Sequence, residues 1–237
     1  MKIHVYKDPQ AVARAAAMIF AGEIMKKDGC VIGLATGSTP VPTYQELIRL
    51  NKEGLLDFSK VISYNLDEYV GLAPDHPCSY RRFMNEQLFD HVNIDKANTH
   101  VPDGVNPNPE AYDEMIRTAG GVDLQLLGIG SNGHIGFNEP ARDFVYPTNV
   151  ITLTENTRRD NARFFSSMDE VPTSAISMGI GTIMSARRII LIATGANKSD
   201  AVAAAVNGPV NPAMPASILR MHPNCQFILD KAAAAKL

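Results

Sequence analysis

Strand-like and helix-like segments alternate along the whole of this 237-residue chain. Short apolar runs rich in Val, Ile and Leu are typical of buried strands, and apolar residues at every third or fourth position are typical of helices. We expect strands at 2–6, 30–36, 60–66, 122–130, 151–154, 187–195 and 225–230, helices at 9–27, 43–54, 79–91, 109–121, 155–165 and 196–206, and a strand, turn and helix within 173–186. This alternation predicts an α/β fold, with one open, mostly parallel sheet and helices on both faces in a Rossmann-like arrangement. The most apolar run, 122–130, should be the central strand.

The length and composition favour one soluble α/β domain over residues 1–237. Hydrophobic residues make up 45% and charged residues 20% of the chain, and the net charge of −3 gives no footprint for a nucleic-acid or membrane partner. No apolar run is long enough to span a bilayer, and the N-terminus lacks the apolar segment of a signal peptide. Cys30, Cys78 and Cys225 lie far apart without a CxxC motif, which argues against a metal site or a disulfide framework and favours the cytoplasm.

Four polar or glycine-rich segments follow apolar runs at the expected ends of strands. They are "ATGSTP" (35–40), "NLDEY" (65–69), "GIGSNGHIGFNEP" (128–140) and "ATGANK" (193–198). In open parallel sheets, ligands bind outside the carboxyl ends of the strands. We therefore expect the four segments to converge on one site for a small molecule.

The segment "ATGSTP" has the composition of a phosphate-binding turn between a strand and a helix. Backbone amides there, together with a helix N-terminus, suit an anion. It matches neither the P-loop nor the GxGxxG pattern, so it indicates neither a nucleoside triphosphate nor a dinucleotide. The alternative is a tight turn in which Ser38 or Thr39 caps the helix. Arg163 and Lys198 are either surface charges or a clamp for the same phosphate.

Acid–base chemistry has candidates in the other two segments. Asp67 and Glu68 are either a solvated or helix-capping acidic pair, or supply a base that abstracts a proton beside a carbonyl. A single His134 is more often structural than catalytic, but here it lies among glycines that allow close approach of a ligand. Glu139 can orient the His134 ring if the loop folds back, and such a pair is a competent proton shuttle.

The sequence resembles the isomerising glucosamine-6-phosphate deaminases. The resemblance covers essentially the whole chain and rests on "LATGSTPVPTYQELI", "NLDEYVGLAPDHPCSYRRFM", "LLGIGSNGHIGFNEP", "NTRRDNARFF", "AISMGIGTIMSARRIILIATGANKSDAV" and "LRMHPN". "DEYVGL" together with "GHIGFNEP" is the most specific part. The resemblance implies conversion of glucosamine 6-phosphate and water to fructose 6-phosphate and ammonia, with no metal or organic cofactor. It also implies the α/β fold shared with ribose-5-phosphate isomerase.

The resemblance also implies roles for individual residues. Asp67 would move the C2 proton of the sugar toward C1, and His134, with Glu139 as its charge partner, would open the pyranose ring. The implied phosphate- and substrate-binding residues are Thr36, Gly37, Ser38, Thr39, Gly136, Arg163 and Lys198. Asn132 departs from the pattern, because well-known relatives have Asp there. It cannot carry a charge, but it can still orient His134 or the substrate through hydrogen bonds.

Two other classes of function remain as alternatives. The first is another enzyme on the same fold, a sugar-phosphate isomerase or a 6-phosphogluconolactonase. A lactonase would need a base for water but no C2 base, so Asp67 argues against it. A sugar-phosphate sensor of a transcriptional regulator would need a DNA-binding segment, and this chain begins directly with its first expected strand. It would also not need Asp67, His134 and Glu139 together.

The resemblance finally bears on regulation. Some longer relatives are hexamers that N-acetylglucosamine 6-phosphate activates at a separate intersubunit site. The corresponding positions here are Arg142, Asn149 and Ile151, and the last two supply no cation for a phosphate. We therefore expect a non-allosteric enzyme that is a monomer or a small homo-oligomer.

Overall fold

The main sheet of the protein has seven strands. The computed structural model describes residues 1–162 and 165–237. The strand order is β1–β10–β9–β6–β2–β3–β5, and all neighbouring pairs are parallel. The strands are β1 (Lys2–Tyr6), β2 (Val31–Leu34), β3 (Ile62–Asn65), β5 (Thr99–His100), β6 (Leu124–Leu127), β9 (Ile189–Ala193) and β10 (Cys225–Asp230). The predicted fold class is confirmed, and β6 is the central strand, as expected from its apolar run.

A second, smaller sheet lies beside the main sheet. It contains β4 (Asp67–Tyr69), β8 (Ser174–Ser177) and β7 (Asn149–Thr152) in the order β4–β8–β7, and both pairs are antiparallel. The sequence predicted strands near β7 and β8 but placed Asp67 just beyond a strand. In the structure, Asp67 begins a strand of its own because it pairs with Ser177 of β8.

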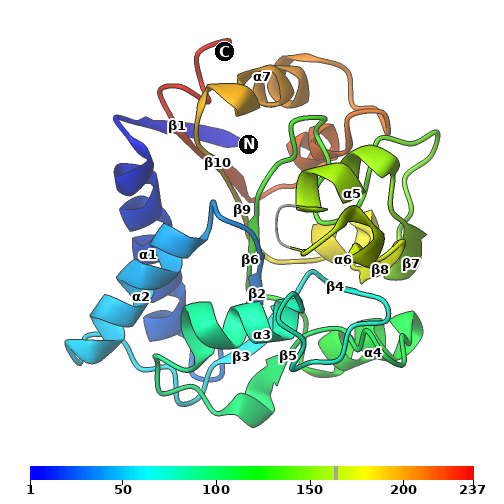
Figure 1. Cartoon of the computed structure of the whole chain (residues 1–237). Coiled ribbons are helices and arrows are strands. Elements are labelled where there is room, and N and C mark those ends of the chain that lie inside the picture. The colour runs from blue at the N-terminus through cyan, green and yellow to red at the C-terminus, as the bar shows by residue number, and fades with distance from the viewer. Residues whose placement is uncertain (163–164) are drawn as a thin grey trace.

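Helices cover both sides of the main sheet. They are α1 (Pro9–Lys26), α2 (Val41–Lys52), α3 (Tyr80–Met84), α4 (Pro109–Thr118), α5 (Glu155–Asn161), α6 (Ile180–Met184) and α7 (Ser199–Asn207). Figure 1 shows α1 and α2 on one side, and α5, α6 and the second sheet on the other. The helix predicted at 79–91 is shorter, because α3 passes into a π-helical turn at Asn85–Phe89. None of the described helices is long and apolar enough to cross a membrane.

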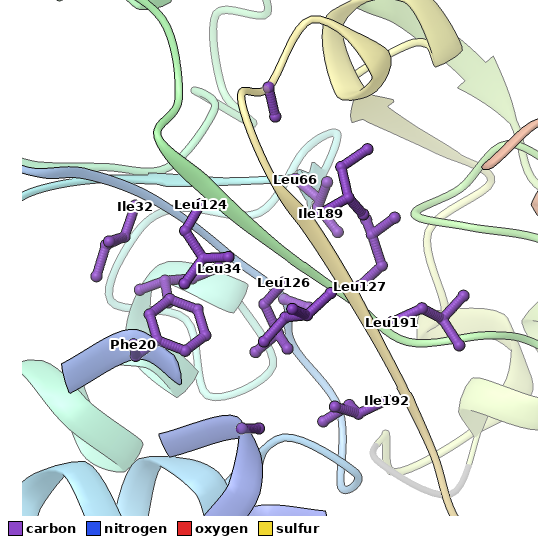
Figure 2. Close-up of a cluster of buried hydrophobic side chains, with 14 of the residues drawn as sticks. Phe20, Ile32, Leu34, Leu66, Leu124, Leu126, Leu127, Ile189, Leu191 and Ile192 are labelled. Carbon is purple, nitrogen blue, oxygen red and sulfur yellow. The ribbon is translucent and has the colours of Figure 1, made fainter. Parts of the chain in front are cut away.

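The core consists of apolar side chains from the central strands and the helices that cover them. Figure 2 shows Phe20 of α1 in one cluster with Ile32 and Leu34 of β2 and with residues of β6 and β9. Phe20, Ile32 and Leu34 are completely buried. Because both faces of these strands are covered, their sequences are almost continuously apolar. The packed strands hold the loops at their carboxyl ends in place.

Candidate active site

A cavity of about 370 Å³ lies at the carboxyl ends of the central strands. All four predicted segments, 35–40, 65–69, 128–140 and 193–198, contribute residues to its wall. The expected convergence is therefore confirmed. The predicted site residues that line the cavity are Thr36, Gly37, Ser38, Thr39, Asp67, His134, Gly136 and Lys198. Arg163 lies outside the described residues.

The loop 35–40 connects β2 to α2 along one wall of the cavity. The capping alternative for Ser38 and Thr39 is wrong: the residue before α2 is Pro40, and no side chain caps this helix. The start of the loop is held by Tyr44, a buried residue of α2. Its hydroxyl donates a hydrogen bond to the carbonyl oxygen of Ala35 at 2.5 Å and accepts one from the Ala35 amide at 3.2 Å. The sequence did not single out Tyr44.

Asp67 faces the cavity from the first position of β4. The residue is only 5% exposed. Burial, together with the negative charge of Glu68, raises the pKa of the Asp67 carboxyl from 3.8 to about 8. A carboxyl group with such a pKa can both accept and return a proton near neutral pH, as a general base for C–H chemistry must.

Gly136 brings the loop 128–140 against β8 beside Asp67. Its φ is 56°, a conformation that favours glycine. A Cβ atom at this position would lie 3.1 Å from Ser177 Oγ and 3.5 Å from Asp67 Oδ2. The adjacent amide of Phe137 donates a hydrogen bond to Ser177 Oγ at 3.1 Å. The backbone of this loop therefore approaches the carboxyl group closely, which explains one of its glycines.

His134 and Glu139 come together because the same loop folds back on itself. Ile135 and Asn138 form an isolated antiparallel bridge between them. Nδ1 of His134 is 3.7 Å from Oε2 of Glu139, which is an ion-pair distance rather than a hydrogen bond. The imidazole ring also packs against Gly130, where a Cβ atom would lie 2.3 Å from two ring atoms. A glycine at position 130 therefore makes room for the ring.

Three polar groups hold this His–Glu pair in place. Asn132 Oδ1 accepts a hydrogen bond from the His134 amide at 3.2 Å, and Asn132 Nδ2 donates one to Glu139 Oε2 at 2.7 Å. Thr157 of α5 donates its hydroxyl proton to Glu139 Oε1. Asn132 thus links the backbone of His134 to the carboxylate of Glu139, while neither Asn132 nor Glu139 lines the cavity directly. Thr157 does line the cavity, and sequence reasoning missed it.

Lys198 reaches the cavity from the short 3₁₀ helix Ala196–Lys198 that follows β9. The loop before it is fixed by Asp230, a buried residue at the end of β10. The Gly195 amide donates to both oxygens of the Asp230 carboxylate, at 3.1 and 3.0 Å. The amide of Lys198 then donates to the Gly195 carbonyl oxygen at 3.1 Å. Lys198 and the loop 35–40 therefore border the same cavity from different strands.

Aromatic residues form a further part of the wall that the sequence did not predict. Tyr69, Tyr80, Phe137 and Phe165 line the cavity. The rings of Tyr80 and Phe137 are nearly parallel, at 13° and 6.1 Å between centroids. The Tyr80 hydroxyl donates to that of Tyr69 at 3.3 Å. These residues come from β4, α3, the loop 128–140 and the segment after α5, so only the folded chain brings them together.

A second cavity, of about 240 Å³, is lined in part by the loop 128–140. Phe137 lines both cavities, and Glu139 lines the second. Asn149 and Ile151 of β7 also line the second cavity, as does Asp143. Within the described part of the chain, its lining contains carboxylates but no Lys or Arg. The same described part holds no group of three His, Cys, Asp or Glu residues that could bind a metal ion.

The main cavity thus combines a buried carboxyl, a His–Glu pair, and a loop and lysine suited to a phosphate. These are the elements of an enzyme that moves protons on a phosphorylated small molecule. The family model described as glucosamine-6-phosphate isomerases/6-phosphogluconolactonase matches residues 7–227, and the chain belongs to this family.

Individual relatives are more specific. The glucosamine-6-phosphate deaminase of Shewanella woodyi is 54% identical over all of this chain and 91% of its own length. That of Alkaliphilus oremlandii is 48% identical over the full length of both chains. A solved structure of a monomeric glucosamine-6-phosphate deaminase superposes with a TM-score of 0.97 at 41% identity and covers both chains completely. The 6-phosphogluconolactonase of Trypanosoma brucei, at 24% identity and a TM-score of 0.78 over 100% of this chain and 98% of its own, shares the fold.

Proposed function

We propose that this protein is a glucosamine-6-phosphate deaminase, which converts glucosamine 6-phosphate and water to fructose 6-phosphate and ammonia. Relatives of that name are about 50% identical over the whole chain. The observation that carries the proposal is the placement of Asp67 and His134 in one cavity with Lys198 and the loop 35–40. A carboxyl for C–H abstraction and a histidine for ring opening are the two proton-transfer groups that this reaction needs.

The first step that we propose is opening of the pyranose ring. His134 accepts the proton of the O1 hydroxyl and supplies a proton to O5, which breaks the C1–O5 bond and yields the aldehyde. Glu139, 3.7 Å from the imidazole, stabilises the ring while it is positively charged. Asn132 needs no charge for its part, because its amide group bonds to Glu139 while its oxygen accepts from the His134 backbone.

The second step is transfer of a proton from C2 to C1 by Asp67. The Asp67 carboxylate takes the C2 proton, the electron pair of that bond forms the C1=C2 double bond, and the aldehyde oxygen takes up a proton from solvent to give an enol intermediate; the proton gained from solvent leaves again with the ammonia. Return of the proton to C1 then gives a ketose imine at C2. Water adds to the imine carbon, and ammonia leaves as the C2 carbonyl forms. Because the Asp67 carboxyl has a raised pKa of about 8, it keeps the proton long enough to return it to C1 and does not release it at once to solvent.

Phosphate binding is the part that we assign to the basic residues. Thr36, Gly37, Ser38 and Thr39 would contact the substrate from one wall, with Lys198 as a cation from another. We also propose Arg163 as the second cation, on the basis of its place two residues after the end of α5. Gly136 would allow the sugar to approach the loop backbone beside Asp67.

The decisive experiment is incubation of the purified protein with glucosamine 6-phosphate. Ammonia and fructose 6-phosphate should appear in equal amounts, and the Asp67→Asn variant should form neither at a comparable rate. Hydrolysis of 6-phosphogluconolactone should be tested in parallel. A protein that releases no ammonia but opens the lactone would contradict the proposal and would favour the lactonase alternative.

We further propose that residues 1–237 act as one catalytic domain in the cytoplasm, as a monomer or small homo-oligomer without a nucleic-acid or membrane partner. The solved relative with a TM-score of 0.97 is described as monomeric. The net charge of −3 gives no attraction to polyanions. Light scattering coupled to size-exclusion chromatography measures the assembly directly, and a stable hexamer would contradict this proposal.

A further inference from the structure

Glu68 lies between two residues of the cavity wall but does not itself line the cavity. Side chains alternate along a strand, so Asp67 and Tyr69 face the cavity from β4 and Glu68 faces the opposite side. Glu68 is only 2% exposed. Burial of a carboxylate is costly unless hydrogen bonds compensate for lost water. The position therefore calls for partners, and the structure supplies them.

Three backbone amides donate hydrogen bonds to the Glu68 carboxylate. The amides of Tyr69 and Tyr80 donate to Oε1 and that of Arg81 donates to Oε2, each at 2.9 Å. Tyr80 and Arg81 are the first two residues of α3. The side chain of Ser79 caps the same helix separately, by accepting from the Arg82 amide at 3.1 Å. Glu68 therefore ties the beginning of α3 to the strand that carries Asp67.

This attachment determines where the aromatic ring of Tyr80 lies. Tyr80 forms part of the cavity wall, and its ring is stacked on Phe137. Its hydroxyl also donates a hydrogen bond to Tyr69. The α-helical part of α3 has only five residues before the π-helical turn Asn85–Phe89, so it contributes little stability of its own. Without the hydrogen bonds that the Glu68 carboxylate accepts from the amides of α3, only the ring contacts of Tyr80 and the Ser79 cap would fix the position of Tyr80.

Glu68 also acts on Asp67 through its charge. It is the anion that, after burial, contributes to the raised pKa of Asp67. The phenols of Tyr69 on β4, Tyr80 on α3 and Tyr112 on α4 also interact with Asp67. His134 of the loop 128–140 and Lys198 line the same cavity as Asp67 and are titratable groups that face it. Burial raises the pKa values of all three phenols, so they are neutral at working pH.

Arg81 is a cationic neighbour of Glu68. Arg81 on α3 and the three amide donors favour the ionised carboxylate of Glu68, whereas burial, the largest effect, raises its pKa. The Arg81 guanidinium is engaged with Thr99, donating to its hydroxyl at 2.8 Å and to its carbonyl oxygen at 2.7 Å. It therefore makes no hydrogen-bonded pair with Glu68 that would replace the amides.

We propose that Glu68 is a positioning residue for the reaction: it anchors Tyr80 and α3 to β4, and it places a second acidic side chain next to Asp67. This inference rests on the proposed function, since it assigns Asp67 as the base. Glu68 does not touch the substrate. It acts from the far side of the strand on two residues that do.

The test compares Glu68→Gln, which removes the charge at nearly constant size, with Glu68→Asp, which keeps the charge on a shorter side chain. The kcat/KM for glucosamine 6-phosphate is measured from pH 5 to pH 9. The acidic limb is the low-pH part of this profile, in which kcat/KM rises as Asp67 ionises. In Glu68→Gln the acidic limb should move to lower pH by about one unit, because Asp67 loses a neighbouring anion. In Glu68→Asp the limb should stay near that of the wild type, while the plateau falls about tenfold because α3 is no longer anchored.

Two controls separate these effects from general damage. Glu110→Gln removes one exposed charge from α4 and should leave both limb and plateau unchanged. A merely structural role for Glu68 would lower the melting temperature and the active fraction without moving the limb. An unchanged limb in Glu68→Gln, or a wild-type plateau in Glu68→Asp, overturns the corresponding half of the proposal.

A second readout does not depend on turnover. The ¹³C resonance of the Asp67 carboxyl, assigned by its loss in Asp67→Asn, gives the titration of this group in the protein without substrate. Its midpoint should also fall by about one unit in Glu68→Gln. A wild type that releases no ammonia would refute the proposed function, whereas an unmoved midpoint would refute the role of Glu68.

Discussion

Asp67→Asn should make the protein more stable while it removes the activity. The pKa of the Asp67 carboxyl rises from 3.8 to about 8 in the folded protein. A raised carboxyl pKa means that the folded state binds this proton more tightly than the unfolded state does. The folded protein therefore loses stability as the pH rises from about 4 to about 8, and the loss is constant above that range. Asn is neutral at every pH and avoids this loss.

The size of the effect follows from the same values. About three pKa units separate 3.8 from pH 7, which at about 1.4 kcal/mol per unit corresponds to about 4 kcal/mol. Asp67 borders a cavity of about 370 Å³, and water in the cavity solvates the anion, so we expect about half of this, or about 2 kcal/mol. For a chain of 237 residues that corresponds to a rise in melting temperature of about 4–8 °C.

The assay is thermal unfolding of both proteins at pH values between 4 and 8. The difference in melting temperature should be near zero at pH 4 and grow toward pH 8. Asp75→Asn is the matched control, because Asp75 is exposed and its substitution should give no such dependence. Turnover should fall by at least about 10²–10⁴-fold, with substrate binding largely retained. Equal melting temperatures of wild type and Asp67→Asn at all pH values would refute the reasoning about burial.

Four other substitutions or measurements test the rest of the site. Lys198→Ala should raise KM by about ten- to a hundredfold through loss of a charge-assisted hydrogen bond; unphosphorylated glucosamine that matched the phosphate ester as a wild-type substrate would contradict this. Thr157→Val should lower kcat about tenfold, since Glu139 loses the hydroxyl donor, and Thr157→Ser should restore it. Gly136→Ala should lower the free energy of unfolding, measured in urea, by about 1–2 kcal/mol, because its φ is 56° and its Cβ would crowd Ser177. Saturation curves should be hyperbolic with and without N-acetylglucosamine 6-phosphate; a sigmoidal curve that this effector made hyperbolic would refute the absence of allostery.

The main sheet was predictable because its signals are local. β1 and β10 have the predicted bounds, 2–6 and 225–230, since each apolar run is flanked by polar or turn-forming residues. The start of α1 was also confirmed: the Asp8 side chain accepts a hydrogen bond from the Ala11 amide at 2.7 Å, with Pro9 at the first helical position. The convergence of the loops followed from the general rule for parallel sheets.

The second sheet and the supports of the site were not predictable in the same way. β4 is three residues long and exists because it pairs with β8, more than a hundred positions away in the chain. No periodicity marks so short a strand. The sequence singled out Asp67 and Glu68 as a pair but could not show that they face opposite sides of one strand. Likewise, Thr157 contacts Glu139 only because α5 folds over the loop that carries it.

The pairing of β1 with β10 has a consequence for synthesis of the protein on the ribosome. Lys2 lies opposite Gln226, so β1 has no partner in the main sheet until the segment that contains β10, more than two hundred positions later, has been made. The carboxylate of Asp230, the last residue of β10, also accepts a hydrogen bond from the Gly195 amide, in the loop before Lys198. Strand β1 therefore stays unpaired during translation until β10 has been made, and until then chaperones and other nascent chains can bind it. The loop before Lys198 therefore gains its hydrogen bond from Gly195 to Asp230 only when β10 has been made.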